Sequence, residues 1–287
     1  MNRWSDRLPL TLQCLLRLRE ALTIASRYVR ASGAAHAQLL ERLPSSLRPL
    51  RFIRLRLLRE RTRLELNWCS WGYRRQFLER RWRRRVRLQT PGPVRELERS
   101  GRGMILASAH YSALLFLGRW LCAAGFAHRR LGVFVDNPSW LDANMRRLSD
   151  GRRLAPRVFS PAHLRRAHAF LRRGGVLIVT VDFARGRMLR LPVGDQFLVV
   201  STGALRLAAA TDAAVVPCIA RERWWWRGQV SFGEPLPREW IADTARHPAA
   251  AARIADFILA AIARDPLQCS DILLRQFESL PQVPHRS

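Results

Sequence analysis

The chain has 287 residues, of which 48% are hydrophobic, and carries 50 Lys and Arg against 22 Asp and Glu, a formal net charge of +28. This length and apolar content exclude a disordered chain and predict a sizeable core, in one large domain or in one domain with a helical extension. Lysine is absent, so the positive charge is carried by arginine, and such an excess attracts nucleic acid, anionic lipid headgroups, phosphate-bearing substrates or acidic carrier proteins.

Residues 1–90 are predicted to form a basic, helical N-terminal region that faces a membrane. Arginines recur from position 48 to position 87, with Leu and Trp side chains such as Leu55, Trp68 and Trp71 between them. A basic helix with interleaved aromatic residues can lie on an anionic membrane surface. The alternative is a solvated helical face with a few core anchors. Arginine with tryptophan also suits single-stranded nucleic acid, but no nucleic-acid module is recognisable, so we do not expect nucleic acid as a partner.

The segment Thr90-Pro91-Gly92-Pro93 interrupts the helical pattern and marks the expected start of an α/β domain over residues 91–287. Beyond it, apolar strand-like runs alternate with helical patterns. Strands are expected at 104–109, 131–136, 157–160, 176–183, 213–219 and 229–232, and helices at 112–124, 139–149, 161–173, 201–211 and 248–264. This alternation predicts an α/β fold, a layered sheet flanked by helices.

The cysteines and histidines do not form a metal-binding pattern. The five cysteines include no CxxC pair, which argues against a zinc site or a disulfide framework and for a reducing compartment. His163 and His168 lie five residues apart, which is poor spacing for a shared metal on one helix. We therefore expect neither a metal nor a cofactor.

His110 is the first candidate for a reactive side chain. It follows the expected strand at 104–109 and precedes the expected helix at 112–124. Ligands gather beyond the carboxyl ends of strands in α/β sheets, and the start of a helix adds a partial positive field. A histidine at this place can accept a proton from an attacking hydroxyl, although a single histidine can equally have a structural role.

A resemblance to a known family strengthens the functional interpretation. The stretch Gly101–Tyr111 resembles the central motif of the late lipid A acyltransferases (lauroyl and myristoyl transferases), which belong to the lysophospholipid acyltransferase superfamily. Further similar segments follow in the same order and together span about residues 90–235: Asp136-Asn137-Pro138 before a helix with Arg146 and Arg147, Phe170–Val176, Thr180-Val181-Asp182, Ser201-Thr202-Gly203-Ala204 and Ala213–Pro217.

The resemblance implies a glycerolphosphate acyltransferase-like fold and a fatty acyl transfer at the cytoplasmic face of the inner membrane. The donor would be acyl-ACP (acyl carrier protein) or acyl-CoA (coenzyme A), and the acceptor a hydroxyl of a lipid or glycolipid. His110 would act as the general base and Asp182 would support it. Arg146 and Arg147 would hold anionic groups of a substrate. Ser201, Thr202 and Gly203 are the remaining expected substrate-binding residues, although the first two can also cap a helix.

The chain departs from the family motif at one position. The family has an acidic residue five positions after the histidine, whereas this chain has Leu115. Three explanations are open. Asp136 or Asp182 replaces the missing carboxylate, or His110 acts without one, or the protein has lost catalysis and binds an acyl carrier or a membrane in support of a partner enzyme.

Overall fold

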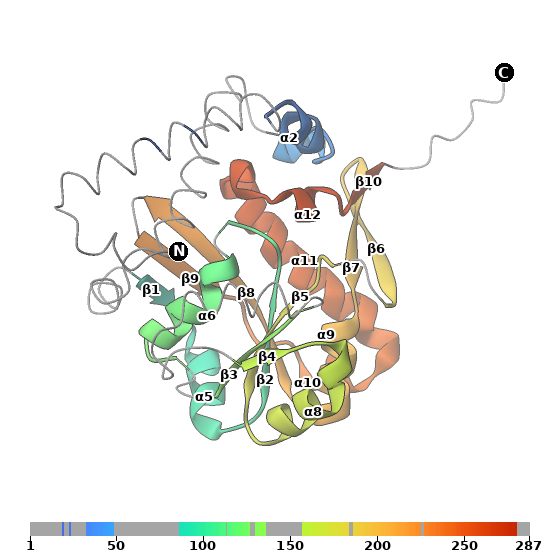
Figure 1. Ribbon diagram of the computed structural model, residues 1–287. Coiled ribbons are helices and arrows are strands. Elements are labelled where there is room, and N and C mark those ends of the chain that lie inside the picture. Colours follow the sequence, from blue (N-terminus) through green and yellow to red (C-terminus); the bar gives the residue numbers. More distant parts are fainter. Residues whose placement is uncertain are drawn as a thin grey trace.

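The computed structural model (Figure 1) describes Arg19, Thr23 and residues 33–48, 86–112, 114–126, 130–135, 157–183, 186–224 and 227–279. The expected helix at 139–149 lies outside these residues, as does nearly all of the arginine-rich stretch from 48 to 87. The predicted membrane-facing character of the N-terminal region therefore stays a prediction.

A mixed, mostly parallel sheet forms the centre of the described part of the chain. Its strands run in the order β1-β9-β8-β2-β5-β3-β4, and every neighbouring pair is parallel except β8 and β9. The strands are β1 (Val86–Gln89), β2 (Met104–Ser108), β3 (Leu131–Phe134), β4 (Arg157–Phe159), β5 (Val176–Thr180), β8 (Ala214–Trp224) and β9 (Arg227–Phe232). A small antiparallel sheet has the order β10-β7-β6 and consists of β6 (Met188–Val193), β7 (Gln196–Ser201) and β10 (Phe277–Ser279).

The helices follow the expected alternation with the strands. The α-helices are α2 (Gly33–Leu40), α5 (Gly92–Ser100), α6 (Leu114–Ala123), α8 (Leu164–Arg172), α9 (Gly203–Thr211), α10 (Arg238–Ala242), α11 (His247–Arg264) and α12 (Asp271–Leu274). Short 3-10 turns lie at η2 (Ser45–Leu47), η3 (Pro161–His163), η4 (Thr244–Arg246) and η5 (Pro266–Gln268). No helix in the described ranges is long and apolar enough to cross a bilayer.

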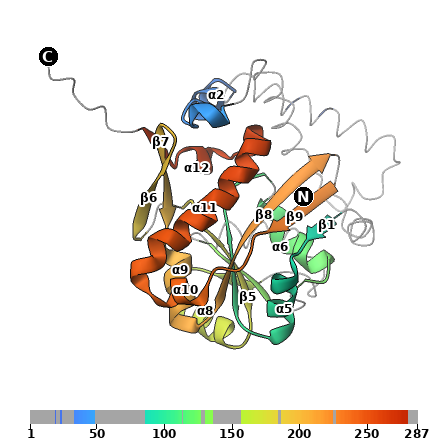
Figure 2. The same ribbon diagram turned by 180° about the vertical axis from the view of Figure 1, so that it is seen from behind.

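The central strands are covered on both faces. On β2, Ile105 and Ala107 join one buried cluster, whereas Met104 and Leu106 join another, as the two-residue repeat of a strand requires. The first cluster packs against α8, α9 and α11, and the second against α5 and α6. Figures 1 and 2 show α11 across one face of the sheet and α5 and α6 on the other. The predicted α/β fold, a layered sheet flanked by helices, is thus confirmed.

The sheet begins earlier in the chain than the boundary expected near residue 90. Strand β1, Val86–Gln89, pairs in parallel with β9, so Thr90 follows a strand and not a helix. Leu40 and Leu43 from the 33–48 segment are also buried, in the same cluster as α11 and α12. Parts of residues 1–90 therefore pack with the α/β core, which the change in composition at Pro91 did not indicate.

Candidate active site

His110 and Asp182 are brought together by the pairing of two parallel strands. In the register of β2 with β5, Ser108 lies opposite Thr180. His110 and Asp182 each follow two residues later, at the same carboxyl edge of the sheet. The amide of Val181 also donates to the carbonyl of Ser108 at 2.8 Å, so the pairing continues past the last strand residues. The apolar sequences of β2 and β5 thus determine the distance between these two polar side chains.

Both oxygens of the Asp182 carboxylate contact His110. Oδ1 lies 2.9 Å from the ring nitrogen Nδ1, and Oδ2 accepts a hydrogen bond of 2.7 Å from the His110 backbone amide. Because an ionised carboxylate can only accept, this geometry assigns the ring proton to Nδ1. The lone pair then resides on Nε2, the nitrogen that a general base requires.

Burial differs sharply between the two partners. The Asp182 side chain is 1% exposed, whereas the His110 side chain is 21% exposed. The carboxylate is therefore shielded from water and held by its two hydrogen bonds, while the imidazole reaches the surface. The ring of Phe183 lies beside the imidazole, with 6.1 Å between the ring centroids. An apolar group that approached His110 would therefore meet an aromatic neighbour.

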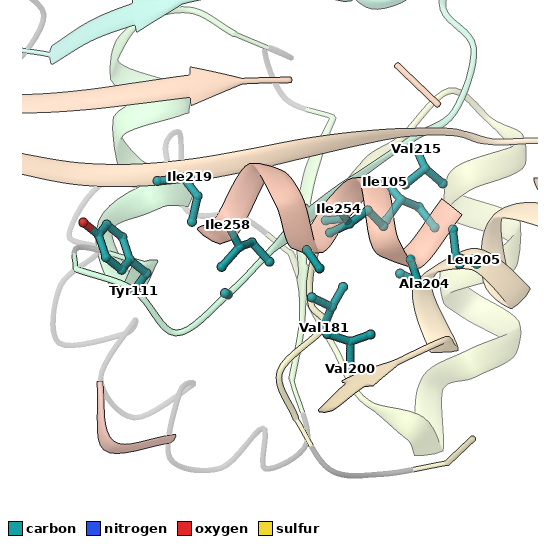
Figure 3. Close-up of a cluster of buried hydrophobic side chains, with 14 of the residues drawn as sticks. Ile105, Tyr111, Val181, Val200, Ala204, Leu205, Val215, Ile219, Ile254 and Ile258 are labelled. Atoms are coloured by element: carbon teal, nitrogen blue, oxygen red, sulfur yellow. The ribbon is translucent and has the colours of Figure 1, made fainter. Parts of the chain in front are cut away.

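A C-terminal segment holds the loop that carries His110. The Ser270 amide donates to the His110 carbonyl at 3.1 Å, and the Ser112 amide donates to the Gln268 carbonyl at 2.7 Å. The oxygen of the buried Tyr111 hydroxyl lies 3.0 Å from the Ala261 carbonyl and 2.9 Å from the Asp265 carbonyl, so these two acceptors share its one proton. Figure 3 shows Tyr111 at one end of the buried cluster, near Ile219 and Ile258.

Ser112 has a left-handed backbone, with φ at +49°. Non-glycine residues adopt this conformation only when their surroundings hold them in it. Here the Ser112 hydroxyl also accepts a hydrogen bond of 3.0 Å from the Glu222 amide. The loop from His110 to Ser112 is thus fixed from several directions before helix α6 begins at Leu114.

The expected substrate-binding group Ser201, Thr202 and Gly203 lies beside the strand end that carries Asp182. The Ser201 amide donates to the Val181 carbonyl at 2.7 Å. The Thr202 hydroxyl is committed to the Arg187 carbonyl at 3.1 Å and does not cap α9, contrary to the capping role expected from the sequence. The Ser201 hydroxyl accepts instead from the Gly203 amide at 3.2 Å. These contacts place the group near Asp182 but leave its role in binding a prediction.

Several expected site residues are not among the residues that the structure describes. Asp136, Arg146 and Arg147 belong to the undescribed residues 136–156. Leu115 lies in α6, but its side chain is not described. In the part of the chain that the structure describes, no three His, Cys, Asp or Glu side chains are grouped in a way that could hold a metal ion.

The sequence indicated no individual role for three residues that contact His110 or its loop: Tyr111, Phe183 and Gln268. Phe183 carried a usable signal, since it directly follows Asp182 at the end of a strand. The contacts of Tyr111 with Ala261 and Asp265 span at least 150 positions, and the Gln268 side chain contacts Glu222 and Asp265, so no local pattern indicates either residue.

Comparisons with known proteins add little to this geometry. No protein-family model and no curated protein matches the chain. One solved structure, the 1-acyl-sn-glycerophosphate (LPA) acyltransferase PlsC from Thermotoga maritima, is similar at 16% identity and a TM-score of 0.43, over 91% of this chain and 99% of that one. A similarity this low supports no conclusion about the activity of this chain.

Proposed function

We propose that the chain is an acyltransferase that moves a fatty acyl group from an acyl carrier protein or coenzyme A thioester to a hydroxyl of a lipid or glycolipid. The observation that supports it most is the 2.9 Å contact between His110 Nδ1 and Asp182 Oδ1, with the ring partly exposed and the carboxylate buried. The resemblance of Gly101–Tyr111 to the late lipid A acyltransferase motif supplies the reaction class. The proposed location is the cytoplasmic face of the inner membrane.

The proposed mechanism uses His110 as a general base. Nε2 accepts the proton of the acceptor hydroxyl as its oxygen attacks the thioester carbonyl. Asp182 stabilises the imidazolium that forms, as the buried carboxylate does in serine hydrolase triads. The tetrahedral intermediate collapses with cleavage of the carbon–sulfur bond, and the departing thiolate takes the proton from Nε2. Backbone amides in the first turn of α6, which begins at Leu114, four residues after His110, are candidates to stabilise the oxyanion.

In this proposal Asp182 takes the part that the family motif gives to an acidic residue at position 115. The replacement carboxylate comes from the neighbouring strand β5 and not from the helix that follows the histidine. The alternative, a catalytically impaired relative that binds an acyl carrier or a membrane and assists a partner, was suggested by Leu115. The His110–Asp182 contact favours the active enzyme.

The experiment that tests the proposal measures acyl transfer from a thioester donor by the full chain and by His110→Ala. We expect the variant to lose nearly all turnover, since no base would remain at the end of β2. His168→Ala is the matched control, because His168 lies on α8, away from Asp182, and is likewise partly buried. Equal turnover in wild type and His110→Ala would refute the assignment.

A second variant separates the active enzyme from the impaired relative. If Asp182 already serves as the carboxylate partner, Leu115→Glu should not raise the rate of acyl transfer above that of wild type. A large gain in turnover from Leu115→Glu would instead identify the natural chain as the impaired relative.

A further inference from the structure

A second concentration of polar side chains lies between the edge strand β4 and helix α8. A cavity of about 330 Å³ is lined there by three arginines and a histidine, Arg157, Arg166, Arg173 and His163, and by the two aromatic rings of Phe159 and Phe170. None of these residues belongs to the site around His110 and Asp182.

The described residues that line the cavity include no Asp or Glu to balance the arginines. No Asp or Glu occurs from residue 157 to residue 181, so strand β4 and helix α8 contribute only positive charge and strand β5 contributes none. None of the three guanidinium groups pairs with a carboxylate among the described residues. Since arginine stays protonated at every physiological pH, the cavity presents a fixed positive field.

The walls of the cavity are held in place. The Ser160 hydroxyl lies 3.0 Å from Nδ1 of His163, which orients the imidazole. The Arg157 guanidinium lies 5.7 Å from the centre of the Phe170 ring, and Phe170 packs on Phe159 at 5.0 Å between centroids. A β-carbon on Gly175 would come within 2.5 Å of Phe170, so the ring fills the space that this glycine leaves. Guanidinium and imidazole groups thus line the cavity together with two aromatic rings that pack against each other.

We propose that this cavity is a binding site for a phosphate group, carried by a phosphorylated small molecule or by a lipid headgroup. The planar guanidinium group of arginine can donate two parallel hydrogen bonds to the oxygens of a phosphate. Several guanidinium groups lining one cavity favour a multiply charged anion over a single carboxylate. The rings of Phe159 and Phe170 are almost fully buried, which leaves the cationic groups to make the contacts with a ligand.

The cavity lies too far from His110 to bind the reacting atoms. Strand β4 is three strands from β2, or ~14 Å across the sheet. Along the strands, Val158 is level with Leu106, which lies four residues before His110. Together these displacements separate Val158 from His110 by on the order of 20 Å. A phosphate bound here would hold a remote part of a substrate or a separate ligand. The inference stands apart from the proposed function, because phosphate binding is measured without turnover.

The test is a calorimetric titration of the full chain with inorganic pyrophosphate at low ionic strength. Arg166→Gln and Arg173→Gln should each weaken binding about tenfold, since each removes charged hydrogen bonds to the anion. Arg165→Gln is the matched control: Arg165 is the exposed neighbour of Arg166 on the same helix but does not line the cavity. It should change the affinity less than twofold. Equal losses in all three variants, or no binding in wild type, would overturn the proposal.

Two further probes identify the source of the phosphate. Desulfo-coenzyme A, which cannot react, represents a nucleotide, and vesicles containing phosphatidic acid represent a lipid headgroup. Binding of desulfo-coenzyme A that Arg166→Gln weakens and Arg165→Gln does not would assign the cavity to a nucleotide phosphate. The same pattern with vesicles only would assign it to a headgroup. If neither probe distinguishes the two variants, the cavity is not a phosphate site for either ligand.

Discussion

Asp182 is a buried carboxylate whose two oxygens both contact His110. A buried carboxylate is costly unless hydrogen bonds compensate for the loss of water. Here one oxygen is bonded to the His110 ring and the other to the His110 amide, so both the orientation of the imidazole and the loop geometry depend on it. The pair of His110 and Asp182 therefore forms without a carboxylate at position 115, where the chain has Leu115.

Cys218 provides a test of the burial of strand β8 at the level of a single residue. It lies on β8 with no exposed surface, and burial raises the pKa of the Cys218 thiol well above its usual range. The thiol then stays protonated and unreactive at neutral pH, since the thiolate is the nucleophile. We expect iodoacetamide to leave Cys218 unmodified in the folded protein and to modify it in denaturant, as measured by peptide mass spectrometry. Rapid labelling under native conditions would show that β8 is not buried as described.

At the scale of elements, strongly apolar segments were predictable from the sequence. Strands β2 and β5 and helix α11 were expected because their runs of apolar side chains are long and periodic. Asp182 was expected from the sequence as a candidate carboxylate for His110, and the parallel register of β2 with β5 brings the carboxyl ends of these two strands together.

The hairpin of β6 and β7 was missed, although it carried a signal. Val193 pairs with Gln196 across the two-residue turn Gly194-Asp195, and Gly194 has φ at +58°. A glycine followed by a polar residue between two strand-like runs is typical of such a hairpin. The contacts of the 265–270 segment with the His110 loop had no comparable signal, because they depend on how the C-terminal residues return to the sheet.

Tyr111→Phe tests whether that C-terminal segment supports the site. The change removes the hydroxyl whose proton the Ala261 and Asp265 carbonyls share but keeps the buried ring. We expect the free energy of unfolding to fall by about 1–2 kcal/mol, because buried acceptors lose a donor. Urea denaturation measures this loss as a lower midpoint at an unchanged slope. An unchanged midpoint would show that the segment does not hold the loop.

For the whole molecule, charge is the dominant feature. A net charge of +28 is concentrated in arginine, and part of it lines the cavity of β4 and α8, while the stretch from 48 to 87 lies outside the described residues. The electrostatic field of this net positive charge favours association with anionic surfaces. A membrane-bound acceptor would be consistent with it.

Vesicle binding tests this interpretation. The full chain should bind vesicles that contain an anionic lipid, and the binding should weaken markedly as salt is raised, because the screening length falls from about 10 Å at 0.1 M to about 3 Å at 1 M. Vesicles of zwitterionic lipid serve as the control and should bind much less. Equal binding to both kinds of vesicle at every salt concentration would contradict an electrostatic membrane contact.

The most direct measurement for the whole account is the rate of acyl transfer from a thioester donor by Asp182→Asn. Asparagine keeps the size of the side chain but removes the negative charge that stabilises the imidazolium, and loss of the corresponding carboxylate in serine hydrolases lowers the rate about 10⁴-fold. The account predicts a loss on the order of 10³-fold or more, with the fold intact. Wild-type turnover in a folded Asp182→Asn protein would contradict it, because the His110–Asp182 pair would then have no part in the reaction.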